Sequence, residues 1–262
     1  MKNKIEHSIQ AKNLRIGYAS KKQETIVTSA INFSISKGSF VCILGKNGAG
    51  KSTLLRTITK VQSKLSGEIL LDGKYLENIS TTELAKKMSL VLTEKIPESN
   101  LSVYELIALG RQPYTNWIGK LNKTDIQKID WAIAQLHIKD ILYKKHTELS
   151  DGQLQKVMIA RALVQDTELI ILDEPTVHLD LHNTVEIFSI LKKLSQEHGK
   201  TILISTHQIH LALQLADKLC LLNNSKMFFG NTQTLIDNGS VANLFHSDLI
   251  RFDVKLKQFI PL

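Results

Sequence analysis

The chain has 262 residues, of which 43% are hydrophobic and 22% charged, a composition that excludes a disordered protein and suits one large α/β domain. Its apolar runs are only as long as strands, and residues 1–7 lack the apolar core of a secretion signal, so we expect no membrane span and a cytosolic location. The net charge of +8 comes from dispersed basic residues without an arginine-rich arm, and we expect no nucleic-acid partner. Cys42 and Cys220 lie in apolar segments without a CxxC pair, which predicts buried free thiols.

Short strands with tight turns are predicted over the first part of the chain. Alternating hydrophobicity predicts strands over residues 9–16 and 30–36, and the run 40–44 is apolar on both faces, as in a central strand. Helical spacing follows over residues 52–61, and then a strand over 67–71 that ends in an Asp-Gly turn.

Helices dominate from about residue 101 to residue 163. Thr124 and Gln127 match a capping box at the start of one helix. The apolar face of this helix is predicted to hold Ile126, Ile129, Ile133 and Leu136.

Strands and helices alternate again in the next part of the chain. A buried strand is predicted over residues 169–172 and a further strand over 201–205. Between them, Asn183 and Glu186 predict the start of a helix. The apolar face of that helix is predicted to hold Val185, Phe188, Leu191 and Leu194. The simplest architecture is a mostly parallel sheet with a helical insertion between its two halves.

A phosphate-binding loop lies between the strand at 40–44 and the helix at 52–61. The sequence reads Gly45-Lys46-Asn47-Gly48-Ala49-Gly50-Lys51-Ser52 and fits the pattern G-x-x-x-x-G-K-[ST] at every position. Glycines let the backbone N–H groups face the phosphates, Lys51 would reach the β- and γ-phosphates, and the Ser52 hydroxyl would hold Mg²⁺. The alternative, a chance glycine-rich turn, does not explain the flanking strand and helix, so we predict that the chain binds a nucleoside triphosphate.

Acidic residues and a histidine follow two other buried strands. Asp173, at the end of its strand, is a candidate Mg²⁺ ligand, and Glu174 is placed to act as general base on the attacking water. His207 follows the strand at 201–205 and could hydrogen-bond the γ-phosphate. A solvated strand end and a structural histidine are the alternatives, and the adjacent P-loop, which needs a metal partner, favours the site.

The sequence "LSDGQLQKVMIARAL" begins at Leu149, and locally it is a polar turn that opens a helix. Together with the P-loop and the acidic strand end, "LSDGQ" makes the chain resemble the ATP-binding subunit of an ABC transporter, over roughly residues 9–229. The resemblance implies an α/β P-loop NTPase core with a mostly parallel central sheet, an N-terminal antiparallel β subdomain and an inserted helical subdomain that carries the signature. It places the ATPase domain at residues 8–230, with the insertion at about 95–163, and a C-terminal extension at 231–262.

The resemblance also implies roles for individual residues. Tyr18 matches the aromatic residue that stacks on adenine, His207 the switch histidine, and Leu179-Asp180 a loop that communicates across a dimer. Ser150, Gly152 and Gln153 match the signature, which contacts ATP bound to the other subunit of a head-to-tail dimer. The expected nucleotide-binding residues are thus Tyr18, Gly45, Asn47, Gly48, Ala49, Gly50, Lys51, Ser52, Thr53, Ser150, Gly152 and Gln153.

Two positions depart from the commoner family pattern. Asp151 stands where the signature usually has glycine, and because a carboxylate would repel a γ-phosphate we expect its side chain to point away and cap the helix. Glu94 stands where the family usually has a glutamine that touches Mg²⁺. We expect Glu94 to face the metal, as Ser52 and Asp173 do, and to alter metal affinity or pH dependence.

Residues 103–114 resemble a stretch of the importers for iron–siderophore complexes, haem and cobalamin, although an ordinary helix ended by Gly110, with Pro113 preventing its continuation, is the alternative. The resemblance implies an ATPase that needs ATP and Mg²⁺, forms a dimer with a second copy, and docks on separate permease subunits at the cytoplasmic face of the membrane. A substrate-binding protein would take part indirectly. An exporter subunit, or a nucleic-acid-associated ABC ATPase, remains the alternative function.

Overall fold

The fold was analysed in a computed structural model that describes residues 6–20, 23–92, 99–116, 119–223, 225–245 and 248–262. A six-stranded sheet runs through its centre in the order β10-β9-β3-β8-β7-β6, and the pairs from β9 to β6 are parallel while β10 is antiparallel. Its strands are β3 (Phe40–Gly45), β6 (Met88–Val91), β7 (Leu169–Asp173), β8 (Thr201–Ser205), β9 (Lys218–Asn223) and β10 (Lys226–Asn231). The parallel strands β3, β7 and β8 are buried along their whole length, as their apolar sequences predict.

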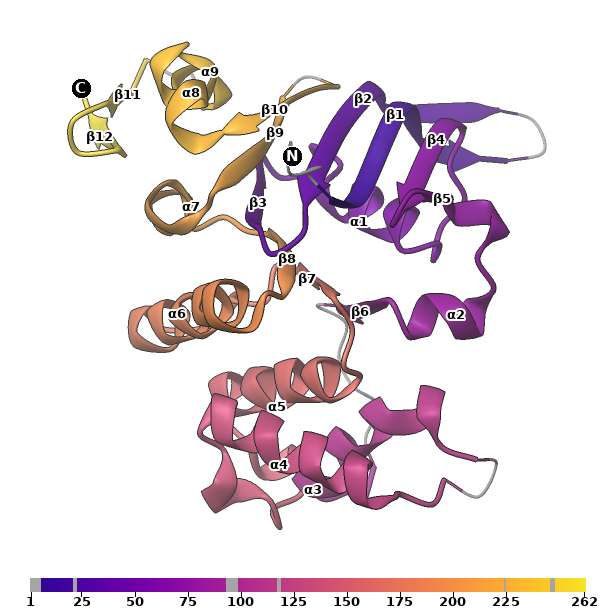
Figure 1. The fold of residues 1–262 in the computed structure, drawn as a ribbon. Helices are drawn as coiled ribbons and strands as arrows, with labels where there is room; N and C mark the ends of the chain where they lie inside the picture. Colours follow the sequence, from indigo (N-terminus) through magenta and orange to yellow (C-terminus); the bar gives the residue numbers. More distant parts are fainter. Residues whose placement is uncertain (1–5, 21–22, 93–98, 117–118, 224, 246–247) are drawn as a thin grey trace, which may run out of the picture.

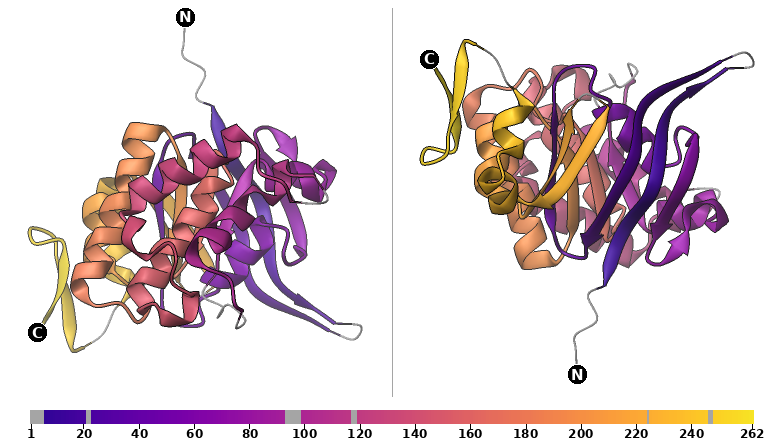
Figure 2. Two further views of the ribbon diagram at one scale, coloured as in Figure 1. Left: turned by 90° about the horizontal axis from the view of Figure 1, so that it is seen from below. Right: turned by 90° about the horizontal axis from the view of Figure 1, so that it is seen from above.

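A second, antiparallel sheet is formed by the N-terminal part in the order β2-β1-β4-β5. Its strands are β1 (His7–Ala19), β2 (Glu24–Ser36), β4 (Ser66–Leu71) and β5 (Lys74–Tyr75). The strands β1 and β2 are longer than predicted, because backbone hydrogen bonds continue the hairpin past the residues that reach the core, and its end projects from the body (Figure 2). Irregular register accommodates Asn13 and Ala30, which both have a positive φ.

The helices form layers on both sides of the central sheet (Figure 1). They are α1 (Lys51–Ile58), α2 (Thr81–Ala85), α3 (Val103–Ala108), α4 (Lys123–Leu136), α5 (Asp151–Val164), α6 (Leu181–His198), α7 (Ile209–Leu215), α8 (Thr232–Asp237) and α9 (Ser240–Leu244). Short 3-10 helices are η1 (Leu76–Asn78), η2 (Leu109–Tyr114), η3 (Lys139–Ile141) and η4 (His146–Glu148). Helix α1 packs in the core between the two sheets, whereas α3, α4 and α5 gather in a separate helical part. Within the described ranges, no helix is both long and apolar enough to cross a bilayer.

The C-terminal residues pack on the main core through aromatic side chains. A hairpin of β11 (Ile250–Asp253) and β12 (Gln258–Pro261) brings Phe252 within 5.0 Å of Phe259, measured between ring centroids, and Phe259 within 5.4 Å of Phe245. All three rings contact the core cluster that contains the helical part.

The two cysteines are buried free thiols, as predicted, and they face opposite sides of the central sheet. Burial raises the pKa of the Cys220 thiol to about 12 and raises that of Cys42 as well. The two residues lie on the neighbouring strands β3 and β9, but the opposite directions of their side chains exclude a disulfide between them.

The start of α4 differs from the prediction. Asn122, not Thr124, caps the helix: its Oδ1 accepts from the N–H of Asp125 at 3.0 Å, and Asp125 Oδ2 accepts from the N–H of Asn122 at 2.9 Å. With the register set by this earlier box, Ile126 is 43% exposed and lies off the buried face. The predicted pair Thr124 and Gln127 is therefore wrong, because the chain enters the helix two residues earlier.

The start of α6 is also earlier than predicted. Asp180 caps the helix and accepts a hydrogen bond from the N–H of Asn183 at 2.8 Å, so the helix does not open at Asn183. Val185 is 40% exposed, whereas Phe188 and Leu191 are buried. In both helices a short polar side chain nearer the loop formed the cap.

In the segment 103–114, helix α3 continues directly into the 3-10 helix η2, which contains both Gly110 and Pro113. The alternative interpretation, a helix that ends at Gly110, is therefore wrong. Gly110 is needed because a Cβ there would lie 2.2 Å from the carbonyl oxygen of Arg161 in α5. Arg111 is 5% exposed; its Nε donates to Asp125 Oδ1 at 2.7 Å and its Nη1 to the Val164 carbonyl at 2.8 Å. One buried arginine thus joins η2, the start of α4 and the end of α5.

Replacing Arg111 with methionine is expected to lower the free energy of unfolding by about 3–5 kcal/mol, because it leaves the Asp125 carboxylate buried without its counter-charge. Urea unfolding followed by circular dichroism would measure the change. The control is Lys193→Met, which removes an exposed pair with Glu197 at 3.9 Å and should cost within about 0.5 kcal/mol. Equal losses in the two variants would contradict the structural role of Arg111.

Candidate nucleotide-binding site

The P-loop lies between β3 and α1, at the carboxyl ends of the parallel strands. Gly48 and Gly50 have positive φ values of 77° and 98°, which other residues adopt only with strain. A Cβ at Gly50 would also lie 2.5 Å from Cγ1 of Val27 on β2. The glycines thus let the loop turn tightly beside the antiparallel sheet, and the N–H of Ala49 closes the turn on the Lys46 carbonyl at 3.1 Å. Such a glycine-rich turn can aim its remaining N–H groups at phosphate.

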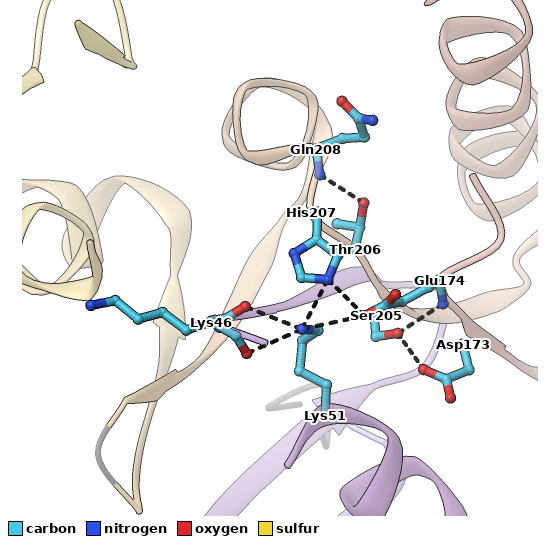
Figure 3. Close-up of polar contacts among 9 residues, drawn as sticks. Lys46, Lys51, Asp173, Glu174, Ser205, Thr206, His207 and Gln208 are labelled. Carbon is cyan, nitrogen blue, oxygen red and sulfur yellow. Dashed lines mark hydrogen bonds and ion pairs between the residues drawn. The ribbon is translucent and has the colours of Figure 1, made fainter. Parts of the chain in front are cut away.

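Lys51 lies beneath this loop and is 5% exposed. Its Nζ donates to the carbonyl of Gly45 at 3.1 Å and contacts that of Lys46 at 3.4 Å (Figure 3). The same ammonium lies 3.3 Å from Glu174 Oε1 and 3.2 Å from His207 Nε2. A buried cation is stable only when it is paired in this way.

Glu174 and His207 complete a triangle with Lys51. His207 Nε2 lies 2.8 Å from Glu174 Oε1, and the two residues come from the ends of β7 and β8. A ring that carries its proton on Nε2 donates to Glu174, whereas a ring protonated only on Nδ1 accepts from Lys51. The structure therefore brings together three residues that are spread over 156 positions of the sequence, the separation of Lys51 and His207.

Ser205 holds the Asp173 carboxylate and the backbone of Glu174, and sequence reasoning did not identify it. Its Oγ donates to Asp173 Oδ1 at 2.6 Å and accepts from the N–H of Glu174 at 2.9 Å. Glu174 has a φ of 46°, a strained conformation that costs about 1–3 kcal/mol and is typical of functional sites. A serine that ends the apolar run of β8, beside an acidic strand end, was the available signal.

The oxygen donors near the P-loop fit Mg²⁺ bound together with phosphates. Asp173 is 2% exposed at the end of β7, and Ser52 lies in the first turn of α1. Among the residues that the structure describes, no group of three or more His, Cys, Asp or Glu could hold a metal by itself. This agrees with Mg²⁺, which usually takes one or two protein oxygens and completes its shell with phosphate and water. Glu94 lies outside the described residues, and its metal contact stays a prediction.

Tyr18 lies near the start of α1, where the resemblance predicts the adenine. Its ring is 55% exposed, and its hydroxyl lies 3.2 Å from Oγ1 of Thr53, which is 7% exposed. This hydrogen bond, which the sequence did not predict, holds an exposed aromatic ring next to the P-loop helix. The ring is thus fixed at one end while its face is open to a ligand.

The signature turn begins α5, in the helical part. Ser150 Oγ accepts from the N–H of Gln153 at 3.3 Å, and Gln153 Oε1 accepts from the N–H of Ser150 at 3.1 Å, which forms a capping box. Asp151 follows the cap and is exposed, so the expectation that Asp151 caps the helix is wrong. Within the described residues, no hydrogen bond or ion pair joins Ser150, Gly152 or Gln153 to the P-loop of the same chain.

The family model of ABC transporters matches residues 28–177, and the chain belongs to this family. An uncharacterized ABC transporter ATP-binding protein of Methanocaldococcus jannaschii is 37% identical over 90% of this chain and 81% of its own length. The iron(3+)-hydroxamate import ATP-binding protein FhuC of Bacillus subtilis is 33% identical over 94% of this chain and 87% of its own. The chain is therefore an ATP-binding subunit with the ATPase activity of this family.

Two solved structures confirm the predicted fold class. A metal-chelate type ABC transporter in an inward-facing conformation contains a chain that is 29% identical, with a TM-score of 0.81 and 98% of both chains covered. An ATP-binding cassette solved as a dimer, in a post-hydrolysis state with ADP and Pi, is 27% identical, with a TM-score of 0.74 over 86% of this chain and 98% of that one. The α/β core and the N-terminal antiparallel sheet are common to this class.

Replacing Tyr18 with phenylalanine keeps the ring but removes its hydrogen bond to Thr53. The KM for ATP is expected to rise about threefold, the effect of one partly exposed hydrogen bond, while kcat stays the same because this hydrogen bond joins Tyr18 to Thr53 and not to the general base. Steady-state ATPase assays would measure both constants. Tyr143→Phe, at a tyrosine that is 94% exposed, is the control, and an unchanged KM for Tyr18→Phe would contradict a role for the hydroxyl.

Proposed function

We propose that this chain is the ATP-hydrolysing subunit of an ABC importer that takes up a metal chelate through separate permease subunits. The chelate would be an iron–siderophore complex, haem or cobalamin. The similarity to FhuC and to the metal-chelate type transporter supports import of this substrate class over export. The resemblance of residues 103–114 to the same importers supports it independently. The chain would lie peripherally on the cytoplasmic face of the membrane and act with a substrate-binding protein.

Two copies of the chain would bind two ATP molecules between them, head to tail. The observation that carries this proposal is the separation of the signature turn from the P-loop of its own chain. Among the described residues, the N–H groups of Asp151 and Gly152 in the first turn of α5 have no acceptor and could bind an anion, and the helix dipole favours negative charge there. Ser150, Gly152 and Gln153 of one copy would then face the γ-phosphate held by Lys51 of the other.

Asp151 adds a negative charge close to this phosphate. Its place in the first turn of α5 stabilises its own carboxylate through the helix dipole, which offsets part of the repulsion.

The triangle of Lys51, Glu174 and His207 suggests how ATP binding prepares hydrolysis. The γ-phosphate would replace Glu174 as the counter-charge of Lys51 and would accept a hydrogen bond from His207. Glu174, released from both partners, would then take a proton from the attacking water. Ser52 and Asp173 would hold Mg²⁺, which neutralises charge on the β- and γ-phosphates. Ser205 keeps the Asp173 and Glu174 positions correct throughout.

The variant Glu174→Gln tests the dimer. Because glutamine cannot act as general base, the variant should bind MgATP without hydrolysing it and elute from size exclusion as a dimer with MgATP and as a monomer without it. Adding Lys51→Ala to the same chain should abolish the dimer, since the γ-phosphate loses its buried counter-charge. A Glu174→Gln chain that binds MgATP and remains a monomer would contradict the ATP sandwich.

The transport function can be tested by reconstituting this chain with a permease that copurifies with it and with a chelate-binding protein that stimulates the complex. In proteoliposomes, the complex should hydrolyse ATP faster when the binding protein is loaded with a ferric hydroxamate, ferric catecholate, haem or cobalamin, and labelled chelate should accumulate on the side opposite the binding protein. The Glu174→Gln complex is the inactive control. Chelate movement in the opposite direction, or an ATPase rate that none of these chelates changes, would rule out the proposed import.

A further inference from the structure

The two loops that face the partner in the proposed dimer lie next to each other within one chain. The signature turn begins α5, and the loop 174–180 leads from Glu174 at the end of β7 to Asp180, the cap of α6. One turn beyond, Lys156 of α5 and Glu186 of α6 form an ion pair at 2.7 Å. The helices α5 and α6 therefore meet near their first turns, so the position of one loop constrains the other.

Asn183 lies between these two loops. A Cβ at Gly152 of the signature would come within 2.9 Å of both Cγ and Oδ1 of the Asn183 side chain. The signature turn thus rests directly on the Asn183 amide, and a Cβ at this position would force that amide to shift.

The Asn183 side chain also contacts the carboxylate of Asp180. Asn183 Nδ2 donates to Asp180 Oδ2 at 2.9 Å, while the N–H of Asn183 donates to Asp180 Oδ1 at 2.8 Å. The backbone hydrogen bond is the main cause of a lowered pKa at Asp180, and the side-chain hydrogen bond lowers it further, so this carboxylate stays ionised at neutral pH. A charge-assisted hydrogen bond of this kind holds the amide in one orientation.

We infer that Asn183 is a positioning residue that holds the signature turn and the loop 174–180 of one chain in register, so that both meet the partner together. The inference rests on the proposed ATP sandwich. Asn183 acts through Gly152 on one side and Asp180 on the other. Its loss would leave the P-loop of the same chain unchanged, since within the described part of the chain Lys51 bonds to Gly45, Lys46, Glu174 and His207 and not to Asn183.

The test compares binding by one chain with association of two, in chains that all carry Glu174→Gln. The variants are Asn183→Ala, Gly152→Ala and the two combined, with Gln196→Ala, at an exposed position of the same helix, as the matched control. Asn183→Ala keeps the backbone hydrogen bond to Asp180, so the cap of α6 remains. Sedimentation velocity in saturating MgATP gives the dimer dissociation constant, and equilibrium binding of MgADP reports on the P-loop of the single chain.

Asn183→Ala should weaken the dimer about tenfold while MgADP affinity stays within about twofold of the parent. Gly152→Ala should weaken the dimer more, because the added methyl group pushes the amide off Asp180. The dimer of the combined variant should be no weaker than that of Gly152→Ala alone. The alanine at position 152 no longer clashes with the Asn183 amide, and the contact that the two residues share can be lost only once. Gln196→Ala should match the parent.

Three results would overturn the inference, and they can be told apart from failure of the proposed function. A dimer of parental affinity in Asn183→Ala, or losses that multiply in the combined variant, would show that Asn183 does not couple the two loops. A loss of MgADP affinity equal to the loss of dimer affinity would show a general structural defect. A parent Glu174→Gln chain that binds MgATP but never dimerises would contradict the ATP sandwich itself, and the positioning role with it.

Discussion

The buried ammonium of Lys51 is the constraint around which the site is arranged. A cation that is 5% exposed needs counter-charge and hydrogen-bond acceptors, and it finds them in two P-loop carbonyls, Glu174 and His207. These partners follow the strands β3, β7 and β8, which lie side by side and in parallel, so their carboxyl ends meet at one edge. The strand order of the central sheet therefore supplies the partners that stabilise the buried Lys51. A γ-phosphate that binds there would replace the Glu174 carboxylate as the counter-charge of Lys51.

The helical part depends on a second buried charge. Arg111 and Asp125 neutralise each other inside it, and the close approach of Gly110 to Arg161 packs η2 against α5. Helix α5, which begins with the signature turn, joins the core through buried apolar residues, and its first turns meet α6 through Gly152 and Asn183 and through the pair Lys156 and Glu186.

Local sequence patterns predicted strongly apolar strands and the P-loop well, and helix starts poorly. The strands β3, β7 and β8 are apolar on both faces. A short continuous apolar run of this kind is typical of a central strand that is covered on both sides. By contrast, Asn122 and Thr124, or Asp180 and Asn183, are comparable capping candidates by residue type. The choice between them depends on where the preceding loop turns into the helix, and in α4 it also depends on the ion pair of Asp125 with Arg111, which is 14 residues away.

The sequence by itself determined the class of the protein, the most apolar strands of its central sheet and the chemistry of the phosphate loop, because each of these depends on residue type and on spacing along the chain. The tertiary structure alone decided which side chains meet. It placed Ser205 on the Asp173 carboxylate and the Glu174 backbone, Tyr18 on Thr53, and the amide of Asn183 against Gly152. It also separated the signature turn from the P-loop of its own chain. Such contacts follow from strand order and from the packing of α5 on α6, and neither leaves a local pattern in the sequence.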